Sequence, residues 1–83
     1  MNNKNNAILF NPMADIGDTL YHKTDLEATR PMILYSYNII SIDTNTREVL
    51  TYTVGCSSID GGSQYYYPHE LNTKEEVLKD NDK

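Results

Sequence analysis

The hydrophobic pattern of the chain is strongest over Met32–Ile42, where nearly every residue is β-branched, aromatic or apolar. This composition predicts a β-strand. One phase of the alternation carries four of these residues, which are Ile33, Tyr35, Tyr37 and Ile39. Ile40 and Ile42 have the opposite phase, so we expect a bulge or a sharp bend in this strand, as small barrels have at their corners.

Shorter stretches predict further strands on both sides of this segment: Thr19–His22, residues 47–54 and residues 64–67. The turn-forming residues 43–46 predict a hairpin between the long strand and the strand that follows it. Pro68 has no backbone N–H to donate and so ends the last strand. Residues 23–31 are polar and residues 55–63 are small, and we expect both segments to form loops.

A short helix is predicted after Thr73. Thr73 and Glu76 have the spacing of a capping box, in which each side chain accepts a hydrogen bond from the other residue's backbone N–H. The helix has at most two turns and would be marginal alone, so apolar residues must dock it onto the sheet. The candidates for that contact are Leu71, Val77 and Leu78.

These elements predict a mainly β fold with four or five short strands and one short C-terminal helix. The sheet is expected to be either a small barrel or a strongly bent antiparallel sheet. We place a flexible N-terminal arm at residues 1–14, a single domain at residues 15–79 and a disordered tail at residues 80–83. A chain of 83 residues has room for one core.

Charge narrows the possible partners. Twelve acidic and seven basic residues give a net charge of −5, and the basic residues are scattered singly. Because nucleic-acid binding needs a basic face, this argues against a direct DNA or RNA partner. An acidic balance suits docking on a basic protein surface, although it also serves solubility alone. The N-terminal residues lack the apolar run of a signal peptide, so we expect a cytoplasmic protein that does not enter a membrane.

Candidate reactive residues are few. His22, Cys56 and His69 lack the spacing of metal ligands, and a single cysteine excludes an intrachain disulfide and a cysteine-based zinc site. Cys56, His22 and Asp60 can be drawn as a nucleophile, a base and an orienting acid, but no motif supports that arrangement. Gly61 and Gly62 lack the lysine of a phosphate-binding loop. We therefore expect no enzyme activity, no metal and no cofactor.

Aromatic residues are the best candidates for contacts with a partner. Alternation puts Tyr65 and Tyr67 on one face of the last strand and Tyr66 on the other. Each tyrosine either anchors an interface or fills the core of a small barrel with its hydroxyl at the rim. Four acids join them as candidate partner-binding residues that mimic phosphates or simply form a solvated surface: Asp25, Glu27, Glu75 and Glu76.

The sequence resembles a family of small proteins in two places. The segment Ile16-Gly17-Asp18-Thr19-Leu20-Tyr21 and the closing segments 65–67, 70–71 and 73–77 are similar to small SH3-like β-barrel accessory proteins. These proteins are encoded by phages and mobile elements of Gram-positive bacteria. The resemblance covers residues 15–79 and implies an SH3-like barrel. It also implies that the chain is an accessory protein. Some members of this group inhibit host defence systems.

The expected function is non-catalytic protein binding. The specific hypothesis is a phage-encoded, anti-CRISPR-like inhibitor that binds a basic, nucleic-acid-binding effector in the bacterial host cytosol. Two alternatives stay open. One is an oligomer that sequesters a small ligand or a nucleotide signal, which would need cations and aromatic residues converging on a pocket and has only Arg30 and Arg47 available in each chain. The other is a structural or assembly protein of the phage particle.

Overall fold

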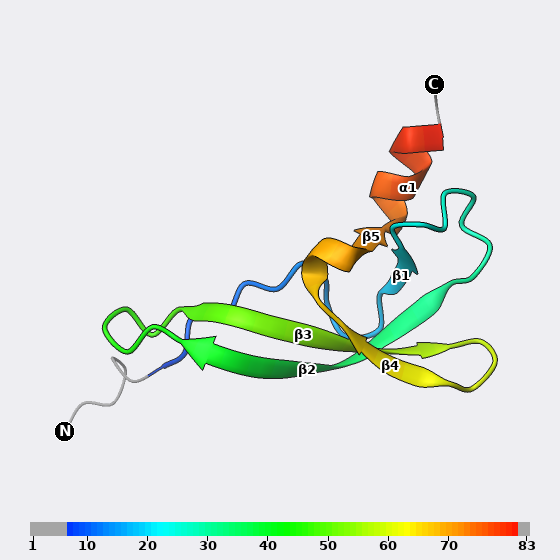
Figure 1. Cartoon of the computed structure of the whole chain (residues 1–83). Coiled ribbons are helices and arrows are strands. Elements are labelled where there is room, and N and C mark those ends of the chain that lie inside the picture. The colour runs from blue at the N-terminus through cyan, green and yellow to red at the C-terminus, as the bar shows by residue number, and fades with distance from the viewer. Residues whose placement is uncertain (1–6, 82–83) are drawn as a thin grey trace.

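The computed structural model describes residues 7–81, and its main element is a five-stranded antiparallel sheet with the strand order β4-β3-β2-β1-β5. One short helix follows the last strand, so the predicted mainly β fold is confirmed. Within the described residues the two edge strands, β4 and β5, do not pair with each other (Figure 1). The elements are β1 Thr19–His22, β2 Met32–Ile42, β3 Val49–Ser58, β4 Ser63–Tyr66, the 3₁₀ turn η2 Pro68–Glu70, β5 Leu71–Thr73 and α1 Lys74–Asn81.

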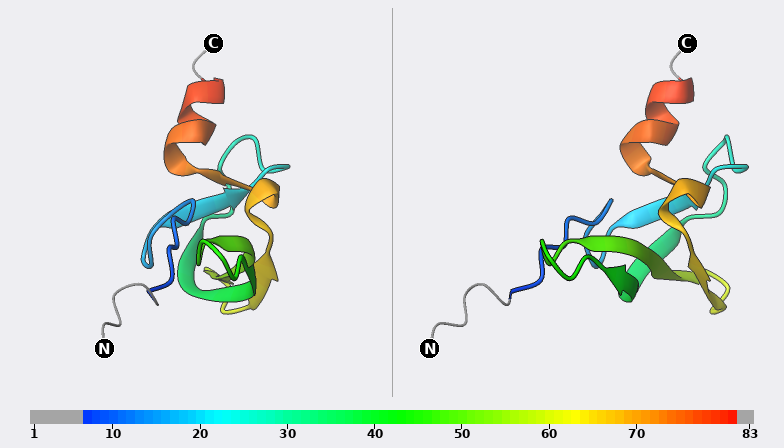
Figure 2. Two further views of the ribbon diagram at one scale, coloured as in Figure 1. Left: turned by 90° about the vertical axis from the view of Figure 1, so that its left-hand side faces the viewer. Right: turned by 60° about the vertical axis from the view of Figure 1, so that its left-hand side comes forward.

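The long hairpin of β2 and β3 dominates the molecule and projects away from the helical end (Figure 1). Its register shifts between Leu34 and Ser36 and again between Ile39 and Ile42. These irregularities confirm the bulge that the change of apolar phase predicted, and each one increases the local twist. The sheet is strongly curved as a result (Figure 2).

The predicted loop over residues 55–63 is wrong in its first half. β3 continues through Gly55 and Cys56 to Ser58, which pairs with Met32 at the start of β2. The remaining turn is short because Gly61 adopts a positive φ of 94° and the Ser58 N–H donates to the Gly62 carbonyl at 2.7 Å. The small residues of segment 55–63 therefore form the end of a packed strand as well as the turn after it.

The concave side of the curved sheet, called the inner face here, holds the core. Its fully or nearly fully buried side chains are Leu20, Met32, Leu34, Val54, Cys56 and Leu71. The alternate residues of the same strands point to the other side, the outer face. Leu34 is 0% exposed, whereas its neighbour Ile33 on the outer face is 42% exposed.

An N-terminal segment, residues 9–14, lies along the hairpin. The Leu9 N–H donates to the Arg47 carbonyl at 2.9 Å, and the Phe10 ring meets the rings of Tyr37 and Tyr52 edge-on with centroids 4.9 and 5.0 Å away. The Met13 N–H donates to the Tyr52 hydroxyl at 2.8 Å. This part of the predicted arm is therefore packed, while residues 1–6 of that arm lie outside the described residues.

Helix α1 begins with the predicted capping box. The Glu76 N–H donates to Thr73 Oγ1 at 3.2 Å, and the Thr73 N–H donates to Glu76 Oε1 at 2.7 Å. The helix packs on β1 and β5, and its Val77 is 2% exposed. Tyr21, buried on the outer face of β1, lies outside the main core cluster, as Val77 does. The helix thus packs at the β1–β5 end of the sheet, away from β4.

The helix ends at Asn81, so residues 80 and 81 of the predicted tail belong to α1. Residues 82 and 83 lie outside the described residues. No helix in residues 7–81 is long and apolar enough to cross a membrane.

Candidate functional site

Two tyrosine rings flank a glycine on the outer face of the sheet. Tyr35 lies on β2 and Tyr65 on β4, and Gly55 lies between them on β3, directly opposite Tyr65 in the register. A Cβ atom on Gly55 would lie 3.0 Å from Tyr65 Cε1 and 3.2 Å from Tyr35 Cζ, so the rings lean over the bare backbone. The rings themselves are 45% and 53% exposed. The missing side chain is what lets the two strands present their rings together.

Apolar side chains extend this surface along the hairpin. Ile33 lies two residues before Tyr35 on the same face and opposite Ser57, and Ile59 in the following turn is 81% exposed. A hollow of about 190 Å³ separates the two isoleucines, with Pro31 at its side. We call Ile33, Tyr35, Ile59 and Tyr65 together the tyrosine face.

The three consecutive tyrosines of the sequence have different environments. Tyr65 belongs to the tyrosine face, but Tyr66 points to the inner face, where it packs against the core and meets the His22 ring at 5.6 Å. Tyr67 lies beyond the end of β4, and its ring stacks on His69 at a centroid distance of 5.7 Å. The predicted placement of Tyr65 and Tyr66 on opposite faces is confirmed, but the prediction that Tyr67 shares a face of the strand with Tyr65 is wrong because β4 ends at Tyr66. Tyr35 was not among the predicted site residues, although its alternation with Ile33 was a signal for it.

Two of the four predicted acids are occupied by contacts within the chain. The Asp25 carboxylate accepts hydrogen bonds from the backbone N–H groups of Thr29 and Arg30, at 3.0 and 2.8 Å, and from the Thr29 hydroxyl at 2.9 Å. The two backbone bonds hold the pKa of Asp25 below its ordinary value. Glu76 is part of the capping box.

Glu27 and Glu75 are exposed. Glu75 lies on α1, which packs on β1 and β5, whereas Tyr65 lies on the edge strand at the opposite end of the strand order. The strand order therefore does not group the helix acids with the tyrosine face.

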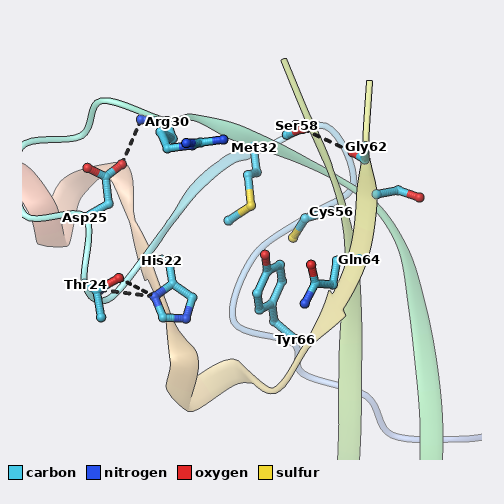
Figure 3. Close-up of a pocket in the computed structure, with 11 residues that line it drawn as sticks. His22, Thr24, Asp25, Arg30, Met32, Cys56, Ser58, Gly62, Gln64 and Tyr66 are labelled. Atoms are coloured by element: carbon cyan, nitrogen blue, oxygen red, sulfur yellow. Dashed lines mark hydrogen bonds between the residues drawn. The ribbon is translucent and has the colours of Figure 1, made fainter. Parts of the chain in front are cut away.

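A pocket of about 300 Å³ opens on the inner face, between the segment that follows β1 and the β3–β4 hairpin (Figure 3). Met32 and Cys56 lie deep in it, and Tyr66 and His22 form one wall. Arg30 and Gln64 lie around its mouth. Sequence reasoning did not find this pocket because its residues come from four separate segments of the chain.

Cys56 was predicted in a loop, but it lies in β3 and is 1% exposed. Burial raises the pKa of its thiol to about 11, so the thiol is protonated near neutral pH and is a poor nucleophile. His22 is held by Thr24, whose Oγ1 lies 2.8 Å from Nδ1. In the part of the chain that the structure describes, no three histidine, cysteine or acidic side chains are placed to share a metal ion.

No family model, no curated protein and no solved structure matches this chain.

Proposed function

We propose that this chain is a non-catalytic protein-binding domain whose partner docks on the tyrosine face. The observation that carries the proposal is the pair of exposed rings, Tyr35 and Tyr65, held side by side over Gly55 on the three strands β2, β3 and β4. Tyrosine rings on a fixed backbone are efficient anchors because they bury a large area while few side-chain torsions become ordered.

The surroundings of the rings support a protein partner. Ile33 and Ile59 add exposed apolar area next to the tyrosines, and the hollow between the isoleucines can receive an apolar side chain. An apolar patch with a polar rim is typical of a protein interaction site.

The net charge of −5 favours a partner with a basic surface over a second copy of this chain, because two such copies repel each other. The acids contribute through long-range attraction. Direct ion pairs are a smaller contribution because Asp25 and Glu76 are already hydrogen-bonded within the chain.

The narrower proposal is that the partner is a bacterial defence effector and that binding inhibits it in the host cytosol. Support for this form comes from the resemblance of residues 15–79 to phage-encoded accessory proteins and from the acidic charge.

Site-specific photo-crosslinking in a Gram-positive host tests the docking surface. A chain with p-benzoylphenylalanine in place of Tyr35 or Tyr65 should give one discrete adduct with a host protein on irradiation. The matched control carries the same group in place of Tyr67, which is similarly exposed at 44% but stacks on His69 outside the tyrosine face. This control should give no such adduct.

The unlabelled Tyr35→Ala/Tyr65→Ala double variant should fail to compete for the captured protein, and added salt should weaken capture of a basic partner. Equal adducts from positions 65 and 67 would contradict docking on the tyrosine face. An adduct with the mass of two copies of this chain would replace the proposed partner by self-association.

A further inference from the structure

The pocket on the inner face is built from residues that the tyrosine face does not use (Figure 3). In β4, Gln64 pairs with Cys56 and Tyr66 pairs with Val54, so the side chains of both point inward with the core. Tyr65 lies between them and points outward. One short strand therefore serves two separate surfaces on opposite sides of the sheet.

The deep part of the pocket is apolar. Met32 is 7% exposed and Cys56 is 1% exposed, and both belong to the core cluster. The Tyr66 and His22 rings lie at 64° to each other and make an aromatic wall. A planar ring is the shape that such a wall accommodates best, by stacking or by edge-to-face contact.

The mouth of the pocket carries a cation whose present partner is weak. The Arg30 guanidinium lies 3.4 Å from the Asp60 carboxylate, and the two side chains are 75% and 70% exposed. An ion pair this exposed contributes little, so an anionic group of a ligand can replace Asp60 and gain a bidentate contact. The neutral Gln64 carboxamide adds donors across the pocket from Arg30 (Figure 3).

Asp25 is the other charged residue of the pocket lining among those described. The Asp25 carboxylate is directed at the N–H groups of Thr29 and Arg30 and so holds the loop that carries Arg30 in place. His22 is fixed in the same way, since the Thr24 N–H donates to its Nδ1 at 3.2 Å. Both the cation-bearing loop and the aromatic wall are therefore positioned before any ligand arrives.

We infer that this pocket binds a small aromatic acid, that is, one planar ring bearing a single carboxylate or phosphate group. The volume of about 300 Å³ lies at the small end of ligand sites, which suits one ring and one anionic group. The ring packs on Tyr66 above Met32 and Cys56, and the anion takes the place of Asp60 at Arg30. This inference goes beyond protein binding and uses none of the residues of the tyrosine face.

Titration of the ¹⁵N-labelled chain, followed by amide chemical shifts, tests the inference. The probes are benzoate for a carboxylate source, phenyl phosphate for a phosphate source, and adenosine monophosphate for a larger phosphate ligand. At least one of the first two should shift the amide signals of Arg30, Gln64 and Tyr66 at millimolar concentration. Saturation by adenosine monophosphate alone would overturn the single-ring size limit.

Arg30→Gln should weaken that binding at least about tenfold, since about tenfold is the value of one charge-assisted hydrogen bond and the bidentate contact has two. Arg30→Lys keeps the positive charge, so its affinity for the ligand should fall between the affinities of the unchanged chain and of Arg30→Gln. Lys74→Gln is the matched control, because it removes one exposed positive charge outside the pocket and should leave affinity unchanged. The inference is overturned if no probe shifts these amides at 10 mM (roughly the weakest binding of interest), or if Arg30→Gln binds as well as the Lys74→Gln control.

Discussion

The two faces of the β2–β3–β4 sheet are made from the same kinds of residue, but one face is buried and the other is exposed. On the inner face, Met32 and Leu34 are buried, and on the outer face, Ile33 and Tyr35 are exposed, although all four are apolar or aromatic neighbours in one strand. The difference arises from what covers each face. Leu20 on β1 and Leu71 on β5 complete the inner core, and residues 9–14 extend the cover along the hairpin.

Within residues 7–81, Ile33, Tyr35 and Tyr65 on the outer face stay exposed, while α1 packs at the far end of the sheet, on β1 and β5. Apolar composition in a strand therefore predicts the strand but not the side on which the core forms. An exposed apolar face lowers the solubility of such a small domain, and exposed apolar patches often mark interaction sites. We therefore propose that a partner covers this face.

The largest difference between the two faces is expected in the free energy of unfolding, when the side chains of two neighbouring residues are shortened to alanine. Leu34→Ala should lower the free energy of unfolding by about 3 kcal/mol because it leaves a cavity in the core. Ile33→Ala removes the same number of carbon atoms from the outer face and should cost about 1 kcal/mol or less. Urea denaturation followed by circular dichroism measures both.

A chain this small has little stability to lose, so Leu34→Val supplies a milder version with a cost of about 1 kcal/mol. Equal costs for Leu34→Ala and Ile33→Ala would mean that the outer face is packed as well as the inner one. That result would also remove the basis for a docking surface there.

Local sequence signals predicted the elements whose causes are local. The capping box of Thr73 and Glu76 needs only four residues, and β2 is a single unbroken run of strand-forming side chains. β5 escaped prediction because three residues carry too little pattern, and it forms by pairing with β1. Gly55 was assigned to a loop because a glycine is usually found in one.

The pocket was beyond sequence reasoning for a related reason. His22, Arg30 and Tyr66 are separated by up to 44 positions in the numbering, and the β1–β2, β2–β3 and β3–β4 pairings together bring them close. Chemistry that depends on a nonlocal arrangement leaves no spacing for a motif search to detect. The tyrosine face is partly different, since the alternation of Ile33 and Tyr35 was visible but its exposure was not.

A second, smaller effect is expected on the outer face at Gly55. In an ordinary strand, Gly→Ala stabilises the fold by reducing the freedom of the unfolded chain. Here the new Cβ would lie 2.5 Å from Ser36 Oγ as well as close to both tyrosine rings, so Gly55→Ala should destabilise by about 1 to 2 kcal/mol. In a Ser36→Ala background this cost should shrink, and the four-variant cycle by urea denaturation measures the coupling. An increase in stability from Gly55→Ala alone would show that the rings do not close over the glycine.

The smallest effect is expected in the pH dependence of the inner side, in the loop that carries Arg30. The backbone hydrogen bonds from Thr29 and Arg30 lower the folded-state pKa of Asp25 below its ordinary value of 3.8. A carboxyl group with a depressed folded pKa stabilises the fold fully above its unfolded pKa, and this contribution is lost as the pH falls through the folded pKa. The amide signals of Thr29 and Arg30 should therefore titrate together with a midpoint below 3.8, while the Tyr65 amide on the outer face should not follow them.

Asp25→Asn keeps one acceptor oxygen but cannot titrate, so the two amide signals should lose this acid transition in that variant. Aromatic-acid binding at the pocket should weaken in step with the Asp25 titration, because the carboxylate is what holds the Arg30 loop in position. A probe with a phosphonate group, such as phenylphosphonate, retains negative charge over this pH range and separates the loop's titration from that of a carboxylate ligand. A midpoint at or above 3.8 would show that the two backbone hydrogen bonds do not stabilise the Asp25 carboxylate. A Tyr65 signal that moves with Thr29 would show that the inner loop and the outer face are not independent.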